Sequence, residues 1–353
     1  MGGHAPIGAV QVHSIVGRGK GDGNRMIQQT IPGTDLHAST ICFGAASIGS
    51  SINESDSFRL MDAFIDQGGN FFDTALNYAN WSCPIPSISE KTIGKWLRTR
   101  PDRDRIIVAT KGACPKPERF FRLSAEEIAA DLQESLTNLQ TDCIGLYWLH
   151  RDDPTRPVEE IVETLNELVR AGHIRFFGCS NWTLERLQEA KRYAESKGLQ
   201  SFCANQMMWS LSSIAKENIS DETIVLMDEA LGAYHEAEQL AAIPFSSQAG
   251  GFFSGRYRRE QPAPERKREF VKQHWHETNF GRLDRVLELA EQTGKTPAAL
   301  ALAYLIAHPF PVFPIIGARN AEQLIESCDA GTFRLDAEAV RFLKGERQES
   351  PKT

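Results

Sequence analysis

Eight short apolar runs alternate with amphipathic segments along nearly the whole chain, and this alternation restricts the fold more than any other feature. Each run is four to eight residues long and rich in β-branched or aromatic residues, which is typical of buried parallel strands. The amphipathic segments often open on Ser, Thr, Asp or Pro with acids in the first turn, as helices do. The runs occupy residues 40–44, 70–73, 105–112, 143–150, 174–181, 200–206, 241–246 and 311–317.

Alternating strands and helices indicate parallel βα units, and eight such units predict a closed (β/α)₈ TIM barrel of the α/β class. The alternative is a doubly wound open sheet, which would carry a G-x-G-x-x-G turn after its first strand. The segment after that strand, TICFGAASIGSS, lacks this turn, so the barrel is favoured. We expect one domain over residues 26–346, a flexible Gly-rich extension over 1–25 and a short polar tail over 347–353.

Charge and cysteine content limit the possible partners. The net charge is −7 with no sustained basic run, so nucleic acid and anionic membrane surfaces are poor candidates for the main partner. Seven scattered cysteines, without a C-x-x-C pair or a zinc-type His cluster, indicate reduced thiols, a cytoplasmic protein and no metal site. No segment approaches membrane-spanning length, and the N-terminus lacks the apolar core of a signal peptide.

Three successive predicted strands end on titratable side chains. Asp73 ends the second strand, Lys111 the third and His150 the fourth, and Tyr78 follows Asp73 in the next loop. In a TIM barrel the carboxyl ends of the strands form one rim, where the chemistry takes place. Any one of these residues alone could belong to an ordinary ion pair or strand terminus. Together they predict a catalytic constellation.

A tyrosine beside a lysine favours acid catalysis by the phenol. Tyrosine titrates near 10, which is high for an acid–base group at neutral pH. A lysine about 4 Å away, at an effective dielectric of about 20, offers up to ~4 kcal/mol, or about three pK units, and would bring the pKa of Tyr78 close to 7. Asp73 would keep Lys111 charged, and His150 would hydrogen-bond the substrate oxygen.

The chain resembles the aldo-keto reductase family from Met26 to about Gly345. The resemblance lies in the segments GTDLHASTICFGAASIG, NFFDTALNY, VATKG, LYWLHRDD, GCSNW, ANQ, PFSSQAGGFFSG and GARNAEQLIES. It implies a (β/α)₈ barrel that binds NADP(H) without a Rossmann domain. It also implies that Asp73, Tyr78, Lys111 and His150 form the catalytic tetrad, with hydride coming from C4 of the nicotinamide and a proton from Tyr78.

The resemblance further implies a set of cofactor contacts, with NADP(H) preferred over NAD(H). They are Gly44 and Ala45 at the first strand end; Ser180, Asn181 and Gln206 at the carboxamide; Phe245 stacked on the nicotinamide; Ser246 and the Gln248–Gly251 backbone over the pyrophosphate; and Gly317, Arg319, Gln323 and Glu326 around adenine and the 2′-phosphate. Arg319 carries the expected preference, since a guanidinium forks onto phosphate oxygens. Ser327 stands where many relatives have Asn, and Phe245 where Tyr or Trp is more frequent.

The sequence constrains the identity of the substrate less than it constrains the fold or the cofactor. Trp81, Phe120 and Arg151 are the expected substrate contacts. The short polar tail and the Arg151–Asp153 run favour a small polar aldehyde, ketone or sugar over a steroid. Two alternatives stay open: a sugar dehydrogenase that works mainly in the oxidative direction, and a cofactor-binding regulatory or redox-sensing subunit like the potassium-channel β subunits. The sequence leaves the oligomeric state open.

Overall fold

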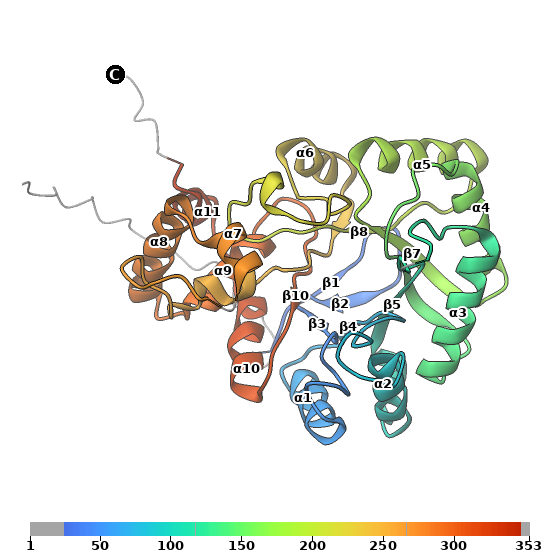
Figure 1. Cartoon of the computed structure of the whole chain (residues 1–353), viewed down its shortest axis with the longest axis horizontal. Coiled ribbons are helices and arrows are strands. Elements are labelled where there is room, and N and C mark those ends of the chain that lie inside the picture. Colours follow the sequence, from blue (N-terminus) through green and yellow to red (C-terminus); the bar gives the residue numbers. More distant parts are fainter. Residues whose placement is uncertain (1–24, 117, 266, 347–353) are drawn as a thin grey trace, which may run out of the picture.

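The computed structural model describes residues 25–346 apart from residues 117 and 266, so residues 1–24 of the predicted extension and the predicted tail lie outside the described residues. Eight parallel strands curl into a barrel in the order β10-β3-β4-β5-β6-β7-β8-β9, and helices surround it (Figure 1). The strands are β3 (Cys42–Gly44), β4 (Phe71–Asp73), β5 (Ile107–Gly112), β6 (Ile144–Leu149), β7 (Ile174–Ser180), β8 (Ala204–Gln206), β9 (Ala241–Ala242) and β10 (Ile315–Ile316).

The barrel closes between the segments of β9 and β10. The Ala242 amide donates to the Pro311 carbonyl at 2.8 Å, and the Phe313 amide donates to the Ala242 carbonyl at 2.9 Å. These bonds complete the ring and confirm the predicted (β/α)₈ barrel over the open sheet. β9 and β10 are shorter than the runs that contain them, because Pro244 and Pro314 lack the N–H that a ladder needs.

Helices follow the strands, most of them where the amphipathic pattern predicts. They are α1 (Glu54–Asp66), α2 (Ile88–Arg98), α3 (Ala125–Leu139), α4 (Val158–Arg170), α5 (Leu184–Lys197), α6 (Glu229–Glu238), α7 (Arg268–His274), α8 (Glu277–Thr293), α9 (Pro297–Ile306), α10 (Ala321–Asp329) and α11 (Ala337–Lys344). Several start on a side chain that accepts an amide of the first turn, and Ser124 forms a full capping box with Glu127. Within the described residues, no helix has the length and apolarity to cross a bilayer.

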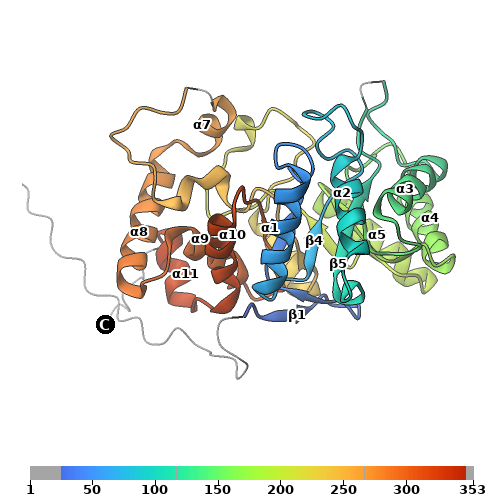
Figure 2. The ribbon, with the colours of Figure 1, turned by 90° about the horizontal axis from the view of Figure 1, so that it is seen from below.

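Besides α7 and α11, a two-stranded hairpin and helix α9 have no counterpart in the sequence-based prediction. A hairpin of β1 (Gln28–Thr30) and β2 (His37–Ser39) covers the amino ends of the strands, at the end of the barrel opposite α7 (Figure 2). Its buried Ile31 and Leu36 join the interior cluster of the barrel. Helix α9 is apolar on nearly all sides and buried along its length, so it has no amphipathic period to signal it.

The barrel interior is packed tightly around Trp148 of β6. A methyl group added at Gly178 of β7 would lie 2.2 Å from the Trp148 ring and 2.6 Å from the Ala204 carbonyl oxygen. Glycine is therefore the residue that lets β6, β7 and β8 approach closely around the indole.

We expect Gly178→Ala to lower the free energy of unfolding by about 1–3 kcal/mol through overpacking. Gly145→Ala is the matched control in β6, because the nearest atoms to its added methyl are 4.0 Å away. Urea unfolding of both variants measures the difference. Equal stability of the two variants would contradict the packing role of Gly178.

Candidate active site

The structure brings Asp73, Lys111 and Tyr78 into direct contact at the carboxyl ends of β4 and β5. Lys111 Nζ donates to Asp73 Oδ2 at 2.5 Å, to the Thr74 carbonyl at 2.8 Å and to Tyr78 Oη at 3.0 Å. An ammonium has three hydrogens, and three acceptors surround this one. Asp73 and Lys111 are both buried, so they form an ion pair shielded from water. The three residues thus meet as the sequence predicts.

Gln206 at the end of β8 fixes the carboxylate from across the barrel. Its Nε2 donates to Asp73 Oδ1 at 2.7 Å, so both oxygens of Asp73 have a donor. The sequence places Gln206 at the nicotinamide carboxamide; here its amide nitrogen holds Asp73. Among the described residues its Oε1 accepts no hydrogen bond, which leaves an acceptor for a ligand N–H.

Burial, rather than the neighbouring lysine, dominates the ionisation of Tyr78. Loss of solvent raises the pKa of the Tyr78 phenol above its ordinary value, although the Lys111 charge pulls it down. The expectation that Lys111 brings this pKa close to 7 is therefore wrong, since it omitted desolvation, which outweighs the charge of Lys111. Burial also disfavours the Lys111 ammonium, but Asp73 and Tyr78 outweigh this and raise its pKa. At neutral pH the phenol is protonated and the lysine is charged.

His150 completes the group directly after β6 (Ile144–Leu149). Its ring lies edge-to-face with Tyr78 at 6.0 Å between centroids. Burial, followed by the charges of Lys111 and Arg151, lowers the pKa of His150 well below its ordinary value, so the imidazole is neutral at pH 7. Its Nδ1 is buried with no hydrogen-bond partner among the described residues.

Ser180 and Asn181 lie buried at the end of β7, and Asn181 takes a left-handed backbone conformation with φ of 60°. Asn181 Nδ2 donates to Ser180 Oγ at 3.0 Å, and its Oδ1 accepts the Val225 amide at 3.1 Å. The conformation turns the chain sharply off the strand. The structure therefore places both side chains at the rim that also carries Gln206.

The side chain of Gln248 connects the loop after β9 to the segment before α10 and to α10 itself. Phe245 is half-buried and Ser246 exposed, followed by a turn in which Gly251 has a φ of 83°. Gln248 Oε1 accepts the Gly317 amide at 2.8 Å, and its Nε2 donates to Ser327 Oγ at 3.0 Å. The side chain of Gln248 is thus occupied in joining two segments, leaving its backbone as the expected ligand contact.

Arg319 and Gln323 are exposed at the start of α10, and Glu326 is half-buried one turn further on. Gln323 Oε1 accepts the Arg319 amide at 3.0 Å, and Asn320 caps the helix through the Gln323 amide. Within the described residues the Arg319 guanidinium has no carboxylate partner. An exposed arginine at a helix N-terminus is a suitable anion contact.

Gly44 and Ala45 have a packing role in this structure. A methyl group at Gly44 would lie 2.7 Å from the Ile315 side chain and 2.9 Å from the Ile316 carbonyl, so glycine allows β3 and β10 to approach. The Ala45 amide donates to the Asp73 carbonyl at 2.8 Å. Gly44 therefore allows the contact of β3 with β10, and Ala45 holds the end of the strand that carries Asp73.

The three expected substrate residues differ in their surroundings. Trp81 is 67% exposed and lies edge-to-face with Tyr78, at 6.1 Å between centroids. Phe120 is exposed in the loop after β5, against Phe121. The Arg151 guanidinium is instead engaged with Asp221, Thr223 and the His150 carbonyl. Trp81 therefore borders the tetrad, whereas the hydrogen-bond donors of Arg151 are already bound to protein acceptors rather than free for a substrate.

Sequence reasoning missed the residues that fasten the loop after β5. Asp131 of α3 accepts the Ala113 amide at 2.8 Å and forms a buried two-point ion pair with Arg122 at 2.9 Å. Asn77 Nδ2 also donates to Cys114 Sγ at 2.7 Å, which joins this loop to the one that carries Tyr78. The buried carboxylate–arginine pair was hidden because both residues lie in segments that resemble ordinary charged helix and loop surface.

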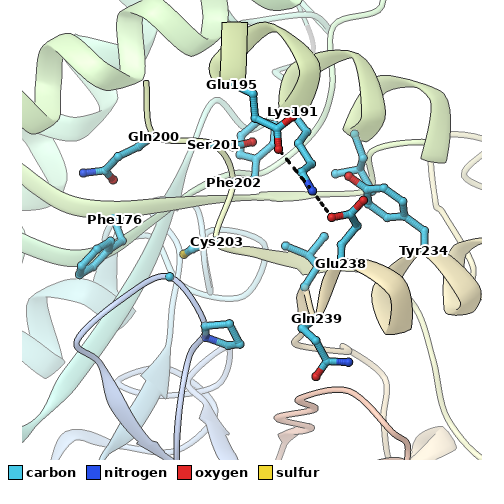
Figure 3. Close-up of a pocket in the computed structure, with 14 residues that line it drawn as sticks. Phe176, Lys191, Glu195, Gln200, Ser201, Phe202, Cys203, Tyr234, Glu238 and Gln239 are labelled. Atoms are coloured by element: carbon cyan, nitrogen blue, oxygen red, sulfur yellow. Dashed lines mark hydrogen bonds and ion pairs between the residues drawn. The ribbon is translucent and has the colours of Figure 1, made fainter. Parts of the chain in front are cut away.

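A cavity of about 280 Å³ lies between α5 and α6, beside the β1–β2 hairpin (Figure 3). Phe202, Cys203 and Tyr234 line it, and Lys191 bridges Glu195 and Glu238 at its edge. It adjoins the amino ends of the strands, whereas the tetrad lies at the carboxyl ends, so the two are separate features. Within the described residues, no three His, Cys, Asp or Glu side chains are placed to hold a metal ion.

Removing one partner of the buried pair tests its energetic importance. Asp73→Asn leaves the Lys111 ammonium buried without a counter-charge, and we expect the free energy of unfolding to fall by about 3–5 kcal/mol. The double variant Asp73→Asn, Lys111→Met buries no charge and should regain part of that loss. Urea unfolding measures both, and an equal loss in the single and double variants would refute the ion-pair account.

Comparisons with known proteins match the chain to one family. A model of the Aldo/keto reductase family matches residues 40–345. An uncharacterised oxidoreductase, YrpG, of Bacillus subtilis is 30% identical over 319 residues, covering 88% of this chain and 92% of that protein. An aryl-alcohol dehydrogenase [NADP(+)] of Phanerodontia chrysosporium is 30% identical over 342 residues, covering 90% of this chain and 84% of that protein.

A third relative is norsolorinic acid reductase B of Dothistroma septosporum, 29% identical over 316 residues, with 84% of this chain and 75% of that protein covered. Among solved structures, the holo form of aldo-keto reductase AKR11C1 from Bacillus halodurans superposes with a TM-score of 0.69 at 24% identity. It covers 92% of this chain and 98% of that one, and it shows the same fold. The chain therefore belongs to the aldo/keto reductase family of oxidoreductases.

Proposed function

We propose that the protein is an NADP(H)-dependent oxidoreductase that transfers hydride between the nicotinamide and a carbonyl or alcohol, with Tyr78 as the general acid/base. The observation that carries the proposal is the contact of Tyr78 Oη with Lys111 Nζ at 3.0 Å, beside the neutral ring of His150. A protonated phenol next to a fixed ammonium is suited to deliver a proton to an oxygen.

In the direction of reduction, the Tyr78 O–H donates its proton to the carbonyl oxygen as negative charge develops there. The raised pKa of Tyr78 keeps the phenol in the donating form at neutral pH. Lys111 stabilises the phenolate that remains, because its charge is fixed by Asp73. Neutral His150 orients the substrate oxygen by a hydrogen bond. The reverse reaction requires Tyr78 to lose its proton first, so neutral pH favours reduction.

The residues present are compatible with a nicotinamide cofactor, which would supply the hydride when bound. Gln206 Oε1 is an acceptor for the carboxamide N–H, beside Ser180 and Asn181. The half-buried ring of Phe245 offers a face for stacking. Arg319, exposed at the N-terminus of α10, supports a preference for the 2′-phosphate of NADP(H), since it can fork onto phosphate oxygens.

Two substrate classes deserve comparison. The first is the small polar aldehyde, ketone or sugar that the short polar tail and the Arg151–Asp153 run of the sequence favour. The exposed Trp81 beside Tyr78 favours an aromatic carbonyl, because an aromatic substrate would stack against it. The names of two relatives, an aryl-alcohol dehydrogenase and a norsolorinic acid reductase, favour the aromatic class as well. Kinetics with 4-nitrobenzaldehyde and with a sugar aldehyde, in wild type and Trp81→Ala, separates the two classes.

We expect Tyr78→Phe to lower kcat for aldehyde reduction by roughly 10²–10⁴-fold, because it removes the proton donor while keeping the ring. Absorbance at 340 nm with NADPH and 4-nitrobenzaldehyde measures the rate. Fluorescence quenching should show unchanged NADPH affinity. Full activity of Tyr78→Phe would refute the assigned role.

Cofactor preference is measured in the same samples. Arg319→Ala should weaken NADPH binding and leave NADH binding nearly unchanged, because only NADPH carries the 2′-phosphate. Tight NADPH binding without turnover on any carbonyl or alcohol would favour a regulatory or redox-sensing subunit. Failure to bind either nucleotide would overturn the proposed cofactor.

A further inference from the structure

Arg151 donates three hydrogen bonds, which join the catalytic rim to a distant loop. Its Nη1 donates to the His150 carbonyl at 2.9 Å, its Nε to Thr223 Oγ1 at 3.0 Å and its Nη2 to Asp221 Oδ2 at 3.0 Å. The guanidinium side chain is only 17% exposed. A lysine could not reproduce this geometry, since a single ammonium cannot hold three acceptors spread over a planar fork.

The loop segment that receives Arg151 is itself a built structure. Asp221 Oδ1 accepts the Thr223 amide at 3.0 Å and the Thr223 hydroxyl at 2.6 Å, which closes a tight Asx turn. The turn presents Asp221 Oδ2 and Thr223 Oγ1 side by side to the guanidinium. Two residues further on, the Val225 amide donates to Asn181 Oδ1 at 3.1 Å. One short segment, 221–225, therefore joins the residue after His150 to a proposed carboxamide contact.

Electrostatics gives Arg151 a second effect on His150. The groups that face the imidazole are Lys111 from β5, the Tyr78 ring from the loop after β4, and Arg151 itself with Asp221 behind it. Burial and the charges of Lys111 and Arg151 lower the pKa of His150 and keep it neutral. Asp221 partly offsets the Arg151 charge, since it lies 3.0 Å from the guanidinium.

We propose that Arg151 is a positioning residue of the active site: its guanidinium holds the His150 backbone and fastens segment 221–225, so that His150 and Asn181 keep one mutual arrangement. This inference rests on the proposed function, in which His150 orients the substrate and Asn181 the nicotinamide. It replaces the expected contact of Arg151 with substrate.

Three variants separate the geometry of Arg151 from its charge. Arg151→Met removes both, Arg151→Lys keeps the charge but loses the fork, and Asp221→Asn keeps the guanidinium but removes its counter-charge. We expect kcat for aldehyde reduction to fall about 10–100-fold in Arg151→Met and Arg151→Lys, because misplacing an orienting group is costly. Asp221→Asn should lose less, since its side-chain oxygen still accepts a hydrogen bond.

The ionisation of His150 provides a readout that needs no turnover. NMR titration of the imidazole in the full chain, assigned with His150→Gln, should show protonation at higher pH in Arg151→Met than in wild type. In Asp221→Asn, His150 should stay neutral to a pH at least as low as in wild type. If Arg151 had a merely structural role, the pH at which His150 is protonated would move in the same direction in Arg151→Met and Asp221→Asn.

The matched control is Arg186 of α5, which binds the next residue, Asp152, at 2.9 and 3.1 Å without touching His150. Arg186→Met should lower stability but leave the His150 titration and kcat near wild type. Wild-type kcat in Arg151→Met, an unmoved His150 titration, or an equal loss of kcat in Arg186→Met would overturn the proposal. If neither the wild type nor any variant reduces a carbonyl, the proposed function fails. The NMR titration of His150 still tests the contact of Arg151 with His150 in that case.

Discussion

The buried ion pair of Asp73 and Lys111 is the interaction on which the site depends. Two charges taken out of water are costly unless every polar atom around them is paired. Here the ammonium has three acceptors and each carboxylate oxygen has a donor. These contacts come from β4, β5, β8 and the loop after β4. The pair is therefore satisfied only when the barrel is closed, which couples the geometry of the site to the integrity of the fold.

The same pair acts on Tyr78 together with burial. Burial keeps the phenol protonated, and the fixed ammonium beside it is ready to stabilise the phenolate. A less buried tyrosine would be a weaker partner for lysine, because water would screen the charge. Burial also keeps His150 neutral. Desolvation thus sets the protonation states of Tyr78 and His150, the two groups that would meet the substrate oxygen. Lys111 acts at the next stage, when it stabilises the phenolate that proton transfer leaves on Tyr78.

The sequence predicted the barrel and the meeting of Asp73, Lys111 and His150, because successive βα units place successive strand ends on one rim. It did not predict the β1–β2 hairpin, whose strands are three residues each, nor α9, which is apolar all round. Both lack the periodic pattern that signals an element.

The hydrogen-bond and ion-pair partners of individual side chains could not be predicted from the sequence either. Arg151 resembles a free cation beside the catalytic histidine, and only the tertiary structure shows it bound to Asp221, 70 residues away. The pKa of Tyr78 was misjudged because a sequence shows that a lysine is near but not how much water is excluded.

Direct titration of the Tyr78 phenol tests the central claim, that burial and the Asp73–Lys111 pair together control this group. Ultraviolet difference spectra between wild type and Tyr78→Phe, recorded against pH, report its ionisation. The account predicts a pKa above the ordinary value of 10.0, rising further in Lys111→Met, because the ammonium is the principal charge that opposes burial. A phenol that ionises near neutral pH in wild type, or one that is insensitive to Lys111→Met, would contradict it.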